Sequence, residues 1–80
     1  MTEVGNRLAQ CFQTVLPYTP AEEISKINVR ELAEANSWAT ATLGAVIEEE
    51  FSIKADLDLL WELGTFEAIE RYLAERLPQN

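Results

Sequence analysis

The 80-residue sequence contains no histidine, a single cysteine and only three glycines. Without histidine, neither a histidine general base nor a histidine metal ligand is available. The one cysteine, Cys11, can form neither an internal disulfide nor a pair of cysteine metal ligands. The glycines are scattered along the chain, so no glycine-rich loop is present to hold a nucleotide. These absences argue against a self-contained enzyme, and we expect a protein without catalytic residues.

Basic residues are also scarce. Six lysines and arginines oppose 14 aspartates and glutamates, which gives a net charge of −8. Such a surface repels phosphate backbones and anionic lipids, so we expect no nucleic-acid partner and no membrane insertion. No apolar run approaches the ~20 residues of a membrane span, and no signal-peptide pattern is found. We expect a monomeric protein in the cytoplasm, because a reducing compartment suits the lone cysteine.

Apolar residues are plentiful, because they make up 48% of the chain. That fraction is ample for a packed core and argues against acidic disorder. A chain of this length buries only about 60–65% of the surface that its unfolded form exposes, so its stability is marginal. It has no room for a second core, and we expect one domain over residues 1–80.

The first third of the chain predicts one helix followed by a long connection. Residues 3–15 carry an apolar stripe with helical spacing, and Thr2 is a suitable N-cap. Pro17 ends this helix. Residues 16–36 show no regular pattern, so we expect a long loop with one short helical turn near residues 20–24. The stripe of the first helix consists of Val4, Leu8, Cys11, Phe12 and Val15.

Two further helices are predicted in the middle of the chain. The longer one covers residues 37–50 with Asn36 as its N-cap. A short helix covers Leu57 to Leu63, because Asp56 is a good N-cap and Gly64 a good terminating residue. The core face of the longer helix consists of Ala39, Leu43, Val46 and Ile47.

The last predicted helix follows Thr65, which serves as its N-cap, and ends at Pro78. Glu67 and Arg71 form a favourable i, i+4 pair on it. Its apolar face consists of Phe66, Ile69, Leu73 and Leu77. The chain is therefore expected to be all-α, with three substantial helices and a short one between the last two.

The helix over residues 37–50 has two features that do not serve stability locally. Glu48, Glu49 and Glu50 crowd its C-terminal end, where each carboxylate costs roughly 0.3–1 kcal/mol. They form either a solvated acidic face or a functional surface. Trp38 lies off the core stripe, and it is either packed against the long loop or offered to a partner. The line that it begins along the helix consists of Trp38, Thr42, Ala45 and Glu49.

Two segments carry a resemblance to a known family. Leu-Ala-Glu-Ala-Asn-Ser-Trp opens the second helix at Ser37, and Val-Ile-Glu-Glu-Glu-Phe-Ser-Ile closes it, with its Glu-Glu-Glu-Phe run starting eleven residues after Ser37. In this register the sequence resembles acyl carrier proteins over nearly its whole length. The family's signature around its modified serine is Gly, an aliphatic residue, Asp, Ser, then Leu or Ile. Here only Ser37 matches, since Asn36 replaces the aspartate and Trp38 the aliphatic residue.

The resemblance implies a four-helix carrier-protein bundle with a long loop between helices one and two and a short third helix. It also implies that a phosphopantetheinyl transferase attaches 4′-phosphopantetheine to Ser37, beside the capping residue Asn36. The arm would carry acyl groups as thioesters between enzymes of fatty-acid or polyketide type. Those enzymes would dock through basic patches on Trp38, Thr42, Ala45, Glu48 and Glu49. We expect no metal.

Three alternatives remain open at this point. The chain could be a carrier fold that is never modified and acts as a binding module. It could be the peptidyl carrier of a nonribosomal system, although the Gly-Gly-x-Ser pattern of such carriers is absent. It could also be an unrelated helical adaptor, which leaves the register match unexplained. In each case Cys11 is expected to pack in the core as a small hydrophobe.

Overall fold

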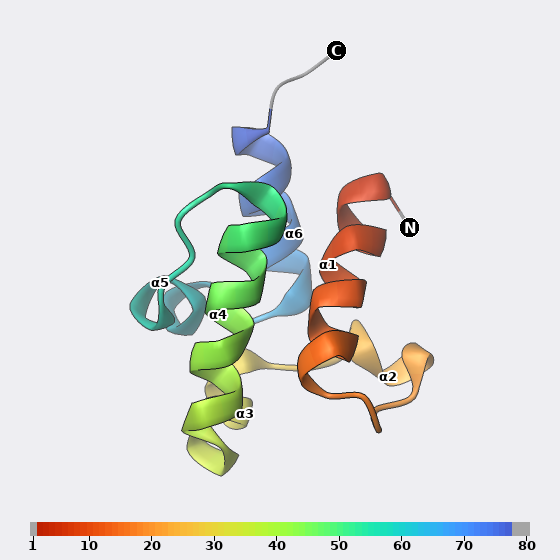
Figure 1. Ribbon diagram of the computed structural model, residues 1–80, viewed down its shortest axis with the longest axis vertical. Helices are drawn as coiled ribbons and strands as arrows, with labels where there is room; N and C mark the ends of the chain where they lie inside the picture. The colour runs from red at the N-terminus through yellow and green to blue at the C-terminus, as the bar shows by residue number, and fades with distance from the viewer. Residues whose placement is uncertain (1, 78–80) are drawn as a thin grey trace.

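The computed structural model describes residues 2–77, which form six helices and no named strand (Figure 1). In chain order the helices are α1 (Glu3–Val15), α2 (Ala21–Ile24), α3 (Val29–Ala35), α4 (Ser37–Phe51), α5 (Leu57–Leu63) and α6 (Phe66–Arg76). The all-α prediction is confirmed. Pro78, which was expected to end the last helix, lies outside the described residues.

The two longest helices form the centre of the molecule. α1 and α4 pack side by side and run in opposite directions, so the C-terminal end of α1 and the N-terminal end of α4 lie at the same end of the long axis (Figure 1). α3 packs against α4 and α5, while α6 packs against α1 and α5. The start of α4 therefore lies at one end of the bundle, beside α3.

Side chains cap the predicted helices at the predicted residues. The side-chain oxygens of Thr2, Asp56 and Thr65 each accept a hydrogen bond from the backbone N–H three residues further on, at 2.9–3.1 Å. These bonds satisfy N–H groups that have no acceptor within the helix. Gly64 ends α5 with a φ of 79°, the left-handed region that glycine adopts without strain.

The connection between α1 and α4 differs from the prediction of a long loop. α2 lies where the short turn was expected, but α3 occupies seven residues that were read as loop. The side chain of Asn28 accepts a hydrogen bond from Arg30 N at 2.9 Å and so caps α3. Val29 N donates to Gly64 O at 2.6 Å, which ties the start of α3 to the turn between α5 and α6. Much of the segment is thus ordered by contacts with the far end of the chain.

Arg30 strengthens the same junction. Its guanidinium donates from Nε to Trp61 O at 2.6 Å and from Nη2 to Glu62 O at 2.9 Å. Both acceptors lie in the last turn of α5, whose carbonyls lack partners within the helix. A cation there also complements the negative end of the helix dipole. Arg30 therefore joins α3 to the end of α5.

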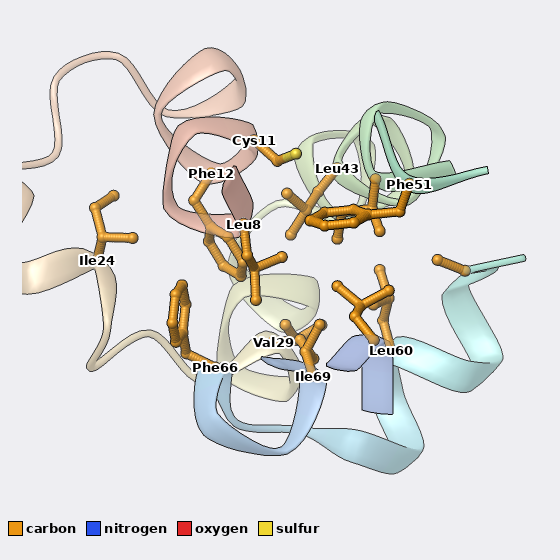
Figure 2. Packing of buried hydrophobic residues seen from close by; sticks show 13 residues of the cluster. Leu8, Cys11, Phe12, Ile24, Val29, Leu43, Phe51, Leu60, Phe66 and Ile69 are labelled. Carbon is orange, nitrogen blue, oxygen red and sulfur yellow. The ribbon is translucent and has the colours of Figure 1, made fainter. Parts of the chain in front are cut away.

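The core receives buried side chains from all six helices, most of them from α1, α4 and α6 (Figure 2). The rings of Phe12 and Phe66 meet at a centroid distance of 5.4 Å. Ala39, Leu43 and Ile47 are buried as predicted. Val46 and Leu77, also expected in the core, are only partly buried against it. The buried apolar residues are Leu8, Cys11, Phe12, Ile24, Val29, Ala39, Leu43, Ile47, Phe51, Ala55, Leu60, Phe66, Ile69 and Leu73.

A close backbone contact fixes the segment between α4 and α5. A Cβ added to Gly44 would lie 2.5 Å from Ala55 O, a distance that only a shift of the backbone could relieve. Leu60 packs against the same position, with its Cδ1 at 3.5 Å from that Cβ. Glycine at residue 44 therefore lets the segment before α5 lie directly on α4.

Candidate functional site

Ser37 occupies a defined place at the junction of two helices. α3 ends at Ala35 and α4 begins at Ser37, so Asn36 alone separates them. Ser37 is exposed. The other two serines end helices, Ser25 after α2 and Ser52 after α4. Ser37 is therefore the one serine of this chain that begins a helix.

Asn36 holds the start of α4 through three contacts. Its side-chain Oδ1 accepts a hydrogen bond from Ala39 N at 3.0 Å. Its carbonyl accepts from Thr40 N at 3.2 Å and from the Thr40 hydroxyl at 3.1 Å. Thr40 is fully buried, and sequence reasoning had not placed it in the core. The predicted cap is thus confirmed, and it fixes the backbone on which Ser37 sits.

The first turn of α4 suits a negatively charged group. The N–H groups of Ser37 and Trp38 belong to this turn and have no acceptor within the helix. No acidic residue lies in the turn itself. The positive end of the dipole of a 15-residue helix favours an anion at this position. A phosphodiester on the Ser37 hydroxyl would therefore meet free N–H donors.

Trp38 is exposed to 73%, which excludes the reading in which its ring packs against the long loop. A tryptophan folded against the preceding segment would be largely buried. Along the predicted line, Ala45 and Glu49 are exposed and Thr42 is half-buried. The Thr42 hydroxyl donates to Trp38 O at 2.9 Å. The line therefore lies on the solvent side of α4, beginning beside Ser37.

The acidic run at the other end of α4 is mostly used within the chain. The Glu48 carboxylate accepts a hydrogen bond from Ala55 N at 2.8 Å. Glu50 pairs with Arg7, whose Nε lies 2.8 Å from the carboxylate and whose Nη2 donates to Glu50 O at 2.8 Å. Within residues 2–77, only Glu49 of the three has no hydrogen bond or ion pair through its side chain. The expectation that the run does not serve stability is therefore wrong for Glu48 and Glu50.

Cys11 packs in the core as expected. Its side chain lies on α1 facing Leu43, and it is 3% exposed (Figure 2). Burial, with a smaller contribution from the negative charge of Glu50, raises the pKa of the Cys11 thiol to about 11. The thiol is therefore protonated at neutral pH and unreactive as a nucleophile.

Sequence reasoning missed two exposed features, one in the turn after α1 and one on α3. Tyr18 is 98% exposed in the turn after α1. Its position between two prolines was the available signal, since an aromatic residue in such a turn has few neighbours to cover it. Glu31 and Glu34 lie exposed on α3, a helix that the sequence did not predict.

Two kinds of feature are absent from the part of the chain that the structure covers. No helix there has the length and hydropathy of a membrane span. Likewise, residues 2–77 hold no group of three or more cysteine, aspartate or glutamate side chains placed to bind a metal ion.

Comparison with known proteins agrees with this geometry. A family model described as "Phosphopantetheine attachment site" matches residues 6–73. Neither the curated proteins nor the solved structures include a match to the chain. Domains of the matched family bear 4′-phosphopantetheine covalently and are not catalytic themselves. Transferases modify them, and synthase enzymes interact with them. The matched region includes α3, α4 and α5 entirely, and the chain belongs to the phosphopantetheine-binding carrier domains.

Proposed function

We propose that this chain is an acyl carrier protein whose 4′-phosphopantetheine arm is attached to Ser37. The single observation that carries the proposal is the place of Ser37, exposed at the first residue of the longest helix. Membership of the matched family indicates that the attached cofactor is 4′-phosphopantetheine. The fold has one serine at the start of a helix, which indicates where the cofactor is attached. The arm's thiol, when present, carries acyl groups as thioesters.

The chain's own residues hold and present the modified group. The Ser37 oxygen forms the bond to phosphorus, the pyrophosphate bond of coenzyme A breaks, and 3′,5′-adenosine diphosphate leaves. In this proposal the base that accepts the hydroxyl proton belongs to the transferase, since the chain has no histidine and no acidic residue lies in the first turn of α4. Asn36 fixes the helix start, and the free N–H groups of the first turn favour the phosphodiester.

The partners of such a carrier are a phosphopantetheinyl transferase and acyl-transferring synthase enzymes of fatty-acid or polyketide type. The proposed docking line on α4 consists of Trp38, Thr42, Ala45, Glu48 and Glu49. Trp38 supports this choice because it is an exposed aromatic anchor beside the attachment site. The net charge of −8 favours partners with basic patches. Glu48 contributes less than Glu49, since its carboxylate is bound to Ala55 N.

Incubation with coenzyme A and a broad-specificity phosphopantetheinyl transferase, followed by intact mass measurement, tests the proposal. The parent protein should gain the mass of one phosphopantetheine group. Ser37→Ala should gain none while keeping the helical circular-dichroism signal, and Ser25→Ala should behave as the parent does. If the parent gains no mass, the chain is an unmodified binding module, and if Ser37→Ala is still modified, the attachment site is elsewhere.

A further inference from the structure

An open hollow, called the α6 hollow below, lies against α6 beside the last residue of α5. Its volume is about 300 Å³, which is at the lower limit for pockets that hold a ligand. The C-terminal half of α6 lies at the opposite end of the long axis from the start of α4 (Figure 1). The α6 hollow is therefore separate from Ser37 and from the docking line on α4. Its lining residues are Leu63, Ala68, Arg71, Tyr72, Glu75 and Arg76.

Two of the six basic side chains of this acidic protein line the α6 hollow. Two other cations hold distant parts of the chain together, since Arg7 binds Glu50 and Arg30 binds the last turn of α5. By contrast, the polar contacts that Arg71 and Arg76 make with described residues all lie within α6 itself. Both arginines can therefore bind a partner without breaking a contact between helices.

The Arg76 guanidinium is held in place by the side chain of Tyr72. Its Cζ lies 3.5 Å from the centroid of the ring, which is a cation–π contact. Its Nη1 also donates to Tyr72 O at 3.2 Å. A guanidinium has five N–H donors in one plane, so the other edge of Arg76 can bind a carboxylate through two parallel hydrogen bonds. Because the side chain is already ordered, less conformational entropy is lost when a partner binds.

Arg71 is the second cation of the lining, and its own partner is easily replaced. Its Nη2 lies 3.0 Å from Glu67 Oε1, with the two side chains 68% and 79% exposed. Such an exposed pair contributes little to stability, so a partner's carboxylate can take the place of Glu67. Glu75 is the one acidic residue of the lining, and it forms no ion pair with a described residue. Two arginines against one glutamate leave the lining positively charged.

The rest of the lining is apolar. Leu63, Ala68 and Tyr72 are half-buried and contribute the less exposed part of the surface. An inorganic anion gains nothing from such a surface, whereas a side chain that packs on it removes apolar area from water. The α6 hollow therefore fits a peptide segment in which a carboxylate neighbours an aromatic or aliphatic side chain.

We propose that the α6 hollow docks an acidic, partly apolar peptide segment of a partner protein. A second copy of this chain is a poorer occupant, because two copies of net charge −8 repel each other. The distant carboxylates of the chain hinder a short segment less, since charges are screened over about 8 Å at physiological salt. A segment bound there leaves Ser37 and Trp38 exposed at the other end of the molecule. The segment thus holds the protein to its partner while the start of α4 stays accessible.

The test follows the backbone amide NMR signals of the isotope-labelled protein while a synthetic peptide is added at physiological ionic strength. In this peptide aspartate alternates with phenylalanine and both termini are blocked, and a second peptide has asparagine in place of aspartate. The variant Arg71→Gln with Arg76→Gln is compared with a control of equal charge change, Lys26→Gln with Lys54→Gln. The control lysines are exposed and lie after α2 and before α5. Glu75→Gln tests the sign of the charge effect.

The aspartate peptide should cause saturable shifts at residues of α6 and at the end of α5. The arginine variant should bind it at least about fivefold more weakly than the parent, and the lysine control should stay within about twofold. Glu75→Gln should bind about twofold more tightly, because it removes the carboxylate that faces the ligand. Ser37→Ala should bind as the parent does, so the result is independent of the proposed attachment.

Four outcomes would overturn the proposal. The first is the absence of saturable shifts, and the second is equal affinity of the arginine variant and the parent. The third is an equal response to the asparagine peptide or to acetate alone, which would show that no acidic peptide is recognised as such. The fourth is a change of the α6 signals with the concentration of the protein alone, which would assign the surface to a second copy.

Discussion

The two ends of α4 carry exposed polar groups but use them in opposite ways. At the C-terminal end, Glu48 and Glu50 bind Ala55 N and Arg7, so the charges hold the fold together. At the N-terminal end, Ser37 and Trp38 are exposed and Asn36 alone is engaged in capping. A run of charge is thus no guide to a docking surface by itself. Exposed groups that make no contact within the fold are the better guide.

The largest expected difference is between two thiols, that of Cys11 in the core and that of the arm proposed on Ser37. Because burial raises the pKa of Cys11 to about 11, its thiolate becomes abundant only as the pH approaches that value. A two-unit rise in pKa lowers the thiolate fraction at neutral pH about 100-fold. A chromogenic thiol reagent should therefore label the modified protein rapidly at one site only. Rapid labelling of the unmodified folded protein would contradict the burial of Cys11.

The next largest effect is expected at Trp38. Trp38→Ala removes an exposed aromatic anchor of about 2 kcal/mol, which corresponds to a roughly thirtyfold loss in kcat/KM for the transferase. The free energy of unfolding should change by less than about 0.5 kcal/mol, since the side chain is mostly exposed. Tyr18→Ala, another exposed aromatic residue, is the matched control and should leave kcat/KM unchanged. A loss of stability in Trp38→Ala would show that the ring packs on the fold.

Substitution of two neighbouring glutamates at the C-terminal end of α4 should change the free energy of unfolding by clearly different amounts. Glu48→Ala removes the acceptor of Ala55 N, and we expect a loss of about 1.5 kcal/mol in the free energy of unfolding. Glu49→Ala should stay within about 0.5 kcal/mol of the parent. Urea unfolding followed by circular dichroism measures both. Equal values for the two variants would remove the structural role assigned to Glu48.

Much of this fold follows from local sequence patterns. α5 was predicted with the bounds observed, and Thr2, Asn36, Asp56 and Thr65 cap the helices they were expected to cap. Such features depend on residues three or four positions apart. The predicted pair of Glu67 and Arg71 is likewise present at 3.0 Å. Short-range rules therefore suffice for the long helices and their ends.

Neither α3 nor the contacts of the acidic run were predicted, because both depend on residues far away in the sequence. Val29 and Arg30 bind carbonyls that lie more than 30 residues further along the chain. Glu50 meets Arg7 across 43 residues. No local pattern reveals such contacts. The position of Ser37 was predictable, but the exposed carboxylates on α3 became visible only with the fold.

A smaller effect is expected at Asn36, the residue that caps α4. Asn36→Ala should lower the free energy of unfolding by about 1 kcal/mol, because Ala39 N loses its acceptor. Asn36→Asp keeps the acceptor and adds a negative charge at the positive end of α4, so stability should match or exceed the parent. Thermal unfolding of the three proteins gives the comparison. A destabilised Asn36→Asp would mean that the amide N–H₂ makes an essential contact.

The smallest effect is expected at the opposite cap. Ser52 ends α4 with a φ of 55°, in the left-handed region that glycine adopts most easily. Ser52→Gly should therefore raise the free energy of unfolding by about 0.5 kcal/mol, since relief of strain is partly offset by the greater freedom of the unfolded chain. Urea unfolding resolves a shift of this size only with replicate curves. A lower stability would mean that the serine side chain stabilises this turn.

The most direct test of the central claim is to locate the modified residue in the parent protein. Cleavage after Arg30 and Lys54 releases residues 31–54, which contain both Ser37 and Ser52. Fragmentation of this peptide by tandem mass spectrometry, after reaction with coenzyme A and transferase, distinguishes the two. Our account predicts that phosphopantetheine is found on Ser37 alone. Its presence on Ser52, or on Ser25 in the preceding part of the chain, would contradict the account.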